Sequence, residues 1–157
     1  MKKLIVVIVA VAVVYGAFYF LDYSKPRSEP DVIVGENLEG EADPSRMTLG
    51  MNTWTWIRAI YNDGREIKPL GTKPFTLTFG NDGKFSATTD CNSMGGSYVA
   101  NAGAISFSQI FSTKMFCEGS QETEFASLLE NTAGYHFTSR GELILDLKFD
   151  SGSVTFR

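Results

Sequence analysis

An apolar run from Leu4 to Leu21 constrains this chain more than any other feature of its sequence. The run contains no charged side chain and follows the basic start Met1 to Lys3. Its length fits the roughly 17–25 apolar residues that a helix needs to cross a bilayer. A cleaved signal peptide is the alternative, but its apolar core is shorter and ends at small residues, whereas Tyr15–Phe20 is rich in aromatic residues. The sequence therefore favours an N-terminal transmembrane signal anchor over residues 1–21.

The charges beside this run predict how the chain is oriented. Lys2 and Lys3 precede the run, whereas the basic residues that follow it are mixed with Asp22 and Glu29. Positive charge tends to stay on the cytoplasmic side of a membrane. We therefore expect a single-pass membrane protein whose C-terminal part is periplasmic or extracellular.

Residues 22–51 differ sharply in composition from the residues on either side. They are rich in Ser, Pro and Gly, interleaved with Asp and Glu. Such a stretch lacks the apolar surface that would offset the entropy of ordering it. We predict a flexible acidic linker over residues 22–51 and a folded domain over residues 52–157. The acidic balance, with a net charge of −4 for the whole chain, also argues against a nucleic-acid partner.

The domain sequence has the alternating pattern of β-strands. Apolar and polar residues alternate in short runs separated by turn residues such as Asn62-Asp63-Gly64. The predicted strands are 54–61, 75–79, 84–88, 96–100, 104–107, 135–138, 143–149 and 153–156. Strands joined by short hairpins indicate an antiparallel sheet. The predicted fold class is mostly β with one α-helix, as an antiparallel curved sheet or a small barrel.

One helix is predicted between the fifth and sixth of these strands. Ser120 can cap its start, Glu122 suits the positive end of the helix dipole, and Gly134 can end it in a left-handed conformation. Its apolar stripe has the helical spacing i, i+3, i+4 and i+7, at Phe125, Leu128, Leu129 and Thr132. We expect the helix to cover or plug the open face of the sheet.

Cys91 and Cys117 are the only cysteines, and both fall in the domain that we expect outside the cytoplasm. In an oxidising compartment a lone pair is most simply a disulfide. Two alternatives compete with that interpretation. The cysteines could be free or regulatory thiols, or Cys91 could be a nucleophile, which would need the single histidine, His136, beside it.

The sequence lacks the residues that a metal site, an acid–base pair or a phosphate-binding loop would require. Two cysteines and one histidine are too few for a typical zinc site. No pair of acidic residues has the spacing of a general acid and base, and Gly95-Gly96 is not followed by the residues of a phosphate-binding loop. We predict no catalytic residues, no metal and no cofactor, and hence a protein that is not an enzyme.

A set of ordered motifs resembles the META/HslJ domain family over residues 52–157. In chain order the motifs are Trp54-Thr55-Trp56, Phe75–Phe79 leading into Asp82-Gly83, Cys91-Asn92 with Gly96-Ser97-Tyr98, Phe111–Glu118, and the strand Gly141–Leu145. The motif residues we single out are Trp54, Cys91, Asn92, Thr113, Met115 and Cys117. Two positions depart from the family pattern: Asp90 stands where Gly is common, and Lys114 where Arg is usual.

The resemblance implies a compact barrel-like or curved-sheet domain with one helix, and it carries over no catalytic residue. Members look like stress-response, envelope-maintenance or secretion-accessory proteins. We therefore predict a non-enzymatic cell-envelope protein with an interaction domain, anchored in the membrane and acting on an envelope protein or lipid. The alternative is that the domain binds a lipid or another apolar small ligand within the cavity of the sheet.

Overall fold

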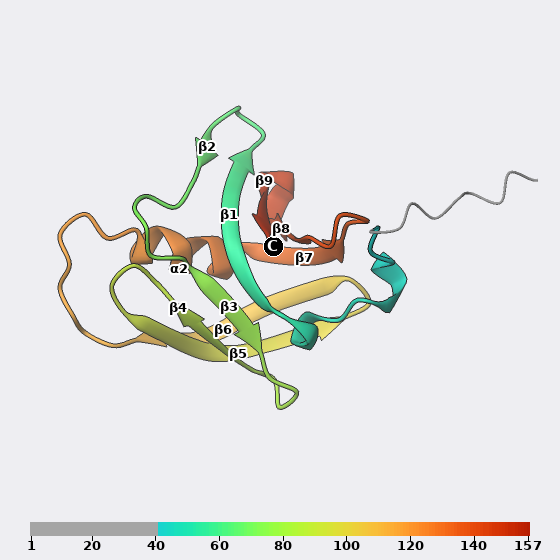
Figure 1. The fold of residues 1–157 in the computed structure, drawn as a ribbon, viewed down its shortest axis with the longest axis horizontal. Coiled ribbons are helices and arrows are strands. Elements are labelled where there is room, and N and C mark those ends of the chain that lie inside the picture. The colour runs from blue at the N-terminus through green and yellow to red at the C-terminus, as the bar shows by residue number, and fades with distance from the viewer. Residues whose placement is uncertain (1–40) are drawn as a thin grey trace, which may run out of the picture. The chain divides into compact units, whose positions relative to one another are not determined.

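Eight antiparallel strands close into a barrel in the computed structural model, which describes residues 41–157 (Figure 1). The predicted anchor and most of the predicted linker lie outside the described residues. Within residues 41–157, no helix is both long and apolar enough to span a membrane.

The strands follow one another around the barrel nearly in chain order. The strands are β1 (Thr53–Tyr61), β2 (Glu66–Ile67), β3 (Thr76–Phe79), β4 (Lys84–Thr88), β5 (Ser93–Asn101), β6 (Ala104–Ser112), β7 (Thr132–Phe137), β8 (Leu143–Leu147) and β9 (Gly152–Phe156). The short β2 pairs only with β1, and the remaining strands form the order β1-β3-β4-β5-β6-β7-β8-β9, in which β9 returns to β1. The predicted antiparallel barrel with one helix is confirmed.

Helical segments occupy the connections. They are the 3₁₀ turns η1 (Pro44–Arg46), η2 (Leu49–Met51) and η3 (Lys148–Asp150), and the α-helix α2 (Glu122–Glu130) between β6 and β7. β6 and β7 pair only at Ala104 and Gly134, and α2 lies against β6. The two strands therefore separate beyond this point, and α2 lies beside β6 there.

The seam between β1 and β9 closes the barrel. Its pairing runs from Trp56 opposite Phe156 to Tyr61 opposite Gly152. A Cβ atom on Gly152 would collide with the carbonyl oxygen of Ile60 and would lie 2.8 Å from the Cα of Tyr61. The backbones approach so closely here that only glycine fits.

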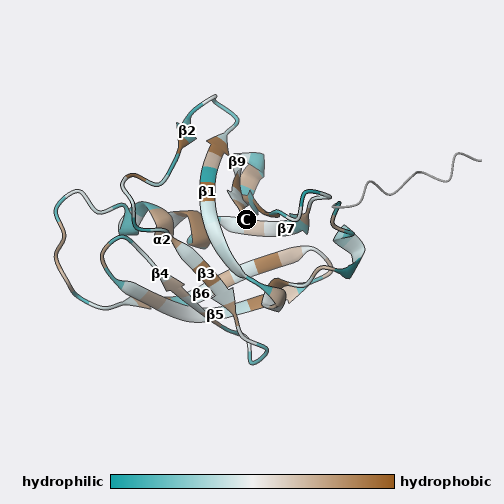
Figure 2. Ribbon diagram, in the orientation of Figure 1, coloured by the Kyte–Doolittle hydropathy of each residue, from teal (hydrophilic) through white to brown (hydrophobic). Residues whose placement is uncertain are grey.

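Side chains fill the interior of the barrel. Alternate residues of each strand point inward, so hydrophobic residues recur along the strands while the turn between β1 and β2 is hydrophilic (Figure 2). The Trp56 ring centroid lies 5.3 Å from that of Phe75 and 5.5 Å from that of Phe125 on α2. The helix thus plugs the barrel with its buried stripe of Phe125, Leu128 and Leu129, as the sequence predicted.

Several element boundaries differ from the prediction. β5 and β6 are both longer than expected, and β8 ends at Leu147 because the η3 turn begins at Lys148. Gly134 does not cap the helix: α2 ends at Glu130, Asn131 occupies the C-cap, and Gly134 lies inside β7. Thr132 explains the early stop, because it is fully buried as the first residue of β7 and its hydroxyl donates to the carbonyl of Leu128.

Residues 42–51, which the composition predicts to be the end of the linker, pack against the barrel. The backbone N–H of Ala42 donates to the carbonyl of Ser139 at 2.8 Å. Leu49 is buried, and its carbonyl accepts a 2.7 Å hydrogen bond from the indole nitrogen of Trp54. The ordered domain thus begins earlier than residue 52.

Candidate functional site

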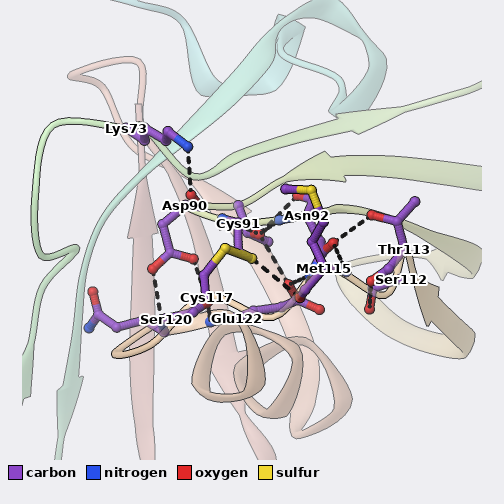
Figure 3. The surroundings of a disulfide bond; sticks show 12 residues. Lys73, Asp90, Cys91, Asn92, Ser112, Thr113, Met115, Cys117, Ser120 and Glu122 are labelled. Atoms are coloured by element: carbon purple, nitrogen blue, oxygen red, sulfur yellow. Dashed lines mark hydrogen bonds between the residues drawn. A yellow bond between two sulfur atoms is a disulfide. The ribbon is translucent and has the colours of Figure 1, made fainter.

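Five of the six motif residues meet at one end of the barrel. Cys91 and Asn92 lie in the turn between β4 and β5, and Thr113, Met115 and Cys117 lie in the loop between β6 and α2 (Figure 3). The sixth, Trp54, is buried in the barrel interior, where its ring stacks on Phe137 at 5.7 Å. We call residues 113–121 the cysteine loop.

Asn92 is the centre of this site. Its side-chain oxygen accepts from the hydroxyl of Thr113 at 2.7 Å and from the backbone N–H of Met115 at 2.9 Å. Its side-chain nitrogen donates to the carbonyl of Met115 at 3.0 Å and to the carboxylate of Glu122 at 2.7 Å. An amide offers two donors and two acceptor positions, and all four are used here. We call Asn92, Thr113, Met115 and Glu122 the Asn92 cluster.

Hydrogen bonds with Thr89 fix the turn that carries Asn92. The hydroxyl of Thr89 donates to the carbonyl of Asn92 at 2.8 Å and accepts from the backbone N–H of Asn92 at the same distance. Both residues are buried. These two hydrogen bonds fix the four-residue turn from Thr89 to Asn92.

A disulfide joins the same two segments covalently. Cys91 and Cys117 are bonded, with their Cα atoms 5.9 Å apart, and no free cysteine remains. The bridge ties the segment before α2 to the end of the β3–β4 hairpin. The alternative of free thiols is therefore not supported by the structure, and a Cys91 nucleophile is excluded in this state.

Asp90, one of the two departures from the family pattern, bonds to the start of the helix. Its carboxylate accepts from the hydroxyl of Ser120 at 2.7 Å and from the backbone N–H of Gln121 at 2.9 Å. Ser120, the predicted cap, accepts from the backbone N–H of Glu122 at 3.1 Å, although Gln121 occupies the N-cap position. A carboxylate at this point also suits the positive end of the helix dipole.

Gln121 is a residue that sequence reasoning missed. It is buried, its side-chain oxygen accepts from the backbone N–H of Leu70 at 2.5 Å, and its nitrogen donates to the carbonyl of Lys68 at 3.0 Å. The loop between β2 and β3 is thereby joined to the helix start. No local pattern marks Gln121, because its partners are about 50 residues away in the sequence.

The cysteine loop presents apolar side chains to solvent. Met115 is 64% exposed and Phe116 is 92% exposed, although the backbone on either side is held by Asn92 and by the disulfide. In Figure 1 the loop extends at the left of the domain, and η1, near where the described chain begins, lies at the right. The exposed apolar residues are therefore remote from the point where the chain enters the domain.

His136 lies away from the cysteines. Its Nδ1 is 3.2 Å from the carboxylate of Asp146 on the neighbouring strand β8, and both side chains are exposed. Among residues 41–157 no group of three or more His, Cys, Asp or Glu side chains is placed to hold a metal ion.

A buried carboxylate is paired near the β7–β8 connection. Glu142 is 5% exposed and accepts from Arg157 at 2.7 Å and from Arg140 at 3.0 Å. Hydrogen bonding from Arg157 is the main reason that the pKa of Glu142 lies below its usual value, with Arg140 adding to the effect against the opposing cost of burial. These contacts join Arg157, which follows β9, to the connection between β7 and β8.

Side chains fill the interior of the barrel, where the alternative prediction places an apolar ligand. Trp54, Trp56, Phe75 and Leu145 are each at most 2% exposed and occupy the space where such a ligand would lie. The structure thus gives no support to a ligand in that position.

These features define a class of protein: a small closed antiparallel barrel with one plugging helix and a cysteine pair at the helix entry. The family model of the META domain matches residues 47–156. The chain therefore belongs to the META domain family. The match begins within the segment that packs against β1, in agreement with the early start of the ordered domain.

Two solved structures share the fold. The NMR structure of a protein from Burkholderia xenovorans superposes with a TM-score of 0.61 at 23% identity, over 84% of this chain and 94% of that one. The crystal structure of a DUF4847 family protein from Bacteroides vulgatus gives a TM-score of 0.53 at 18% identity, over 69% of this chain and 92% of that one. No curated protein matches the sequence. At these identities the likeness concerns the fold alone.

Proposed function

We propose that this chain is a non-enzymatic protein of the cell envelope, in which residues 1–21 anchor a META domain that works as an interaction module outside the cytoplasm. The apolar run and its basic flank support the anchor. The disulfide supports the compartment, because such bonds persist where the surroundings are oxidising. The partner is an envelope protein or a lipid, and the role fits stress response, envelope maintenance or secretion.

The cysteine loop is the observation that carries the interaction role. Phe116 is 92% exposed, although its backbone is held between Asn92 and Cys117. Exposed aromatic and Met side chains are enriched at protein interfaces. A loop that is already ordered loses less conformational entropy when it binds. The loop is thus well suited to insert Met115 and Phe116 into a partner.

The Asn92 cluster supports a structural role for the polar residues at this site. The four hydrogen-bonding positions of Asn92 are occupied by groups of the domain itself, and Cys91 is bonded to Cys117. A catalytic group must instead meet a substrate with its reactive atom free. The cluster shapes the loop rather than acting on a substrate.

Protease protection tests the proposed topology. Protease added to intact spheroplasts should remove the domain while a cytoplasmic marker survives. The expected product is a short fragment that stays with the membrane and contains residues 1–21. A domain that stays protected until the membrane is dissolved would contradict the proposal.

Photo-crosslinking tests the interaction role. A photoreactive phenylalanine analogue placed at Phe116 of the full chain should give discrete adducts in living cells. The matched control is the same analogue at Phe149, which is 98% exposed but lies on η3. Adducts common to both positions, or no adduct at Phe116, would contradict a role for the cysteine loop.

A further inference from the structure

An open pocket of about 370 Å³ lies over strands β4, β5 and β6. It is separate from the cysteine loop and from the Asn92 cluster. Its lining residues are Lys84, Phe85, Gly96, Ser97, Gln109 and Phe111. The volume is near the lower end of the range for small-molecule sites, so it suits a single chain of atoms rather than a bulky ligand.

A break in the pairing of β5 with β6 shapes the pocket. Gly95 and Gly96 are consecutive residues of β5 at this break and face opposite sides of the sheet, Gly95 toward the exposed Phe111 and Gly96 toward the buried Phe85. A Cβ on Gly96 would lie 2.6 Å from the ring of Phe85 and 2.8 Å from the carbonyl of Ser108. The ring of Phe111 lies across Gly95 and is 68% exposed. The result is a hollow with an aromatic wall.

The opposite wall is polar and carries one positive charge. The ammonium of Lys84 donates to the hydroxyl of Ser97 at 2.9 Å, and that hydroxyl donates to the side-chain oxygen of Gln109 at 3.1 Å. No carboxylate in residues 41–157 lies within ion-pair distance of Lys84. Asp82, the nearest acidic residue in sequence, accepts from the backbone N–H of Lys84 instead. The ammonium therefore keeps donors available for an external anion.

The backbone at Gln109 also points to a site. Gln109 has a φ of +52°, a left-handed conformation that glycine adopts more easily than any residue with a side chain. The pairing explains this conformation, because Gln109 and Ile110 of β6 lie opposite the single residue Gly96 of β5 and form a β-bulge. Bulges are common beside binding sites, where they redirect a side chain. Here the side-chain oxygen of Gln109 accepts from the hydroxyl of Ser97, which itself accepts from the ammonium of Lys84.

We propose that this pocket binds a single-chain amphiphile whose head is a carboxylate or a phosphate. The anionic head would meet the ammonium of Lys84 and the amide of Gln109, and the apolar chain would lie along Phe111 and the backbone of Gly96. Charge complementarity selects the head, because the one ionic group in the lining is a cation that has no carboxylate partner among residues 41–157. The site does not depend on the proposed interaction of the cysteine loop.

Photolabelling of the full chain in its native membranes tests this site. The probe is a dodecanoate that carries a diazirine at the end of its chain, and labelled peptides are mapped by mass spectrometry. The apolar run Leu4–Leu21 provides an internal measure of non-specific labelling. Relative to that run, we expect strong labelling of strands β4 to β6 near Phe111, which excess dodecanoate removes and dodecyltrimethylammonium does not.

Variants make the test specific. Lys84→Met and Phe111→Ser should each lower the normalised labelling about tenfold, since one removes the charge and the other the aromatic wall. The matched control is Val99→Ser, which removes an exposed apolar residue of β5 outside the pocket lining. Competition by the cationic amphiphile, equal labelling in Lys84→Met, or labelling no stronger than in the apolar run would overturn the proposal. Binding of anionic vesicles without labelling of this pocket would overturn it as well.

Discussion

The barrel interior and the Asn92 cluster stabilise the same domain by different means. Trp56, Phe75 and Phe125 pack their rings at 5.2–5.5 Å and exclude water, so burial of apolar surface stabilises them. Asn92 sits among polar groups and is stabilised by four directional hydrogen bonds beside a covalent bridge. The shape and volume of the side chains determine the stability of the barrel interior. The identity of the hydrogen-bond donors and acceptors determines the stability of the Asn92 cluster.

The difference teaches what each region tolerates. An interior of this kind accepts a change that keeps its volume, because packing does not depend on particular atoms. A saturated polar cluster accepts almost no change, since each lost partner leaves a buried group without a hydrogen bond. The Asn92 cluster also holds the exposed cysteine loop in place. Substitutions in the cluster should therefore affect function, whereas substitutions in the interior should affect folding.

The largest expected effect is in the interior. Trp56→Ala should lower the free energy of unfolding by about 3–5 kcal/mol, because it leaves a cavity beside the rings of Phe75 and Phe125. Denaturant unfolding followed by circular dichroism measures this loss. An effect as small as that of an ordinary surface substitution would show that the helix collapses onto the gap.

A pair of conservative variants sharpens the same point. The indole nitrogen of Trp54 donates to Leu49, whereas that of Trp56 is buried without a partner among the described residues. Trp54→Phe should therefore cost more stability than Trp56→Phe, by about 1 kcal/mol, the value of one hydrogen bond. Equal losses would mean that only volume matters at both positions.

The disulfide should have the next largest effect. Cys117→Ser should fold but lose roughly 2–4 kcal/mol, because the unfolded chain is no longer constrained by a loop of 26 residues. Wild-type protein from its native compartment, unfolded without reductant, should take up no alkylating reagent by intact-mass measurement. Uptake of two alkyl groups, or a variant as stable as wild type, would mean that hydrogen bonds alone stabilise this end of the barrel.

Asn92 tests whether identity rather than volume decides the cluster. Asn92→Ala should cost about 1–3 kcal/mol, since Thr113, Met115 and Glu122 lose partners. Asn92→Asp keeps the shape but turns an oxygen toward the carboxylate of Glu122, so it should cost more than the alanine variant at neutral pH. The free energy of unfolding of both variants, measured by denaturant at the same ionic strength, tests this prediction. An aspartate variant more stable than the alanine variant would contradict it.

The smallest expected effect is at Glu142 and depends on pH. Its pKa in the folded state is held below the usual 4.5, so its pairing with Arg157 and Arg140 stabilises the fold above that pH. The contribution is lost as the pH falls through the lower, folded-state pKa. Glu142→Gln should therefore flatten the loss of stability on acidification, measured by denaturant unfolding across pH 2–7. If the Glu142→Gln variant loses as much stability on acidification as the wild type, other groups are responsible for the acid sensitivity.

The sequence predicts the interior better than it predicts the cluster. Period-2 runs such as Phe75–Phe79 locate the inward-facing residues, because alternation is a local property of a strand. Local reasoning fails where tertiary contacts override it. Gly134 has the chemistry of a helix cap, but Thr132 is already buried in β7 and ends the helix first.

The candidate site could be located only in part. The lone cysteine pair predicts the Cys91–Cys117 disulfide and the family motif includes Asn92, but neither indicates the hydrogen bonds that Asn92 makes. The roles of Asp90 and Gln121 could not be predicted, since the groups that they bind are brought near only by the closed barrel. The pocket beside Lys84 escaped prediction for the same reason: it depends on a shift in pairing between β5 and β6.

The seam at Gly152 also sets the order in which this domain can form. β9 is the last strand of the barrel in chain order, yet it pairs with β1, the first. Until β9 emerges, β1 has an unpaired edge and the barrel interior has no wall on that side. Such long-range pairing slows folding and leaves a nascent chain open to aggregation. The barrel can therefore close only after β9, the last of its strands in chain order, has been synthesised.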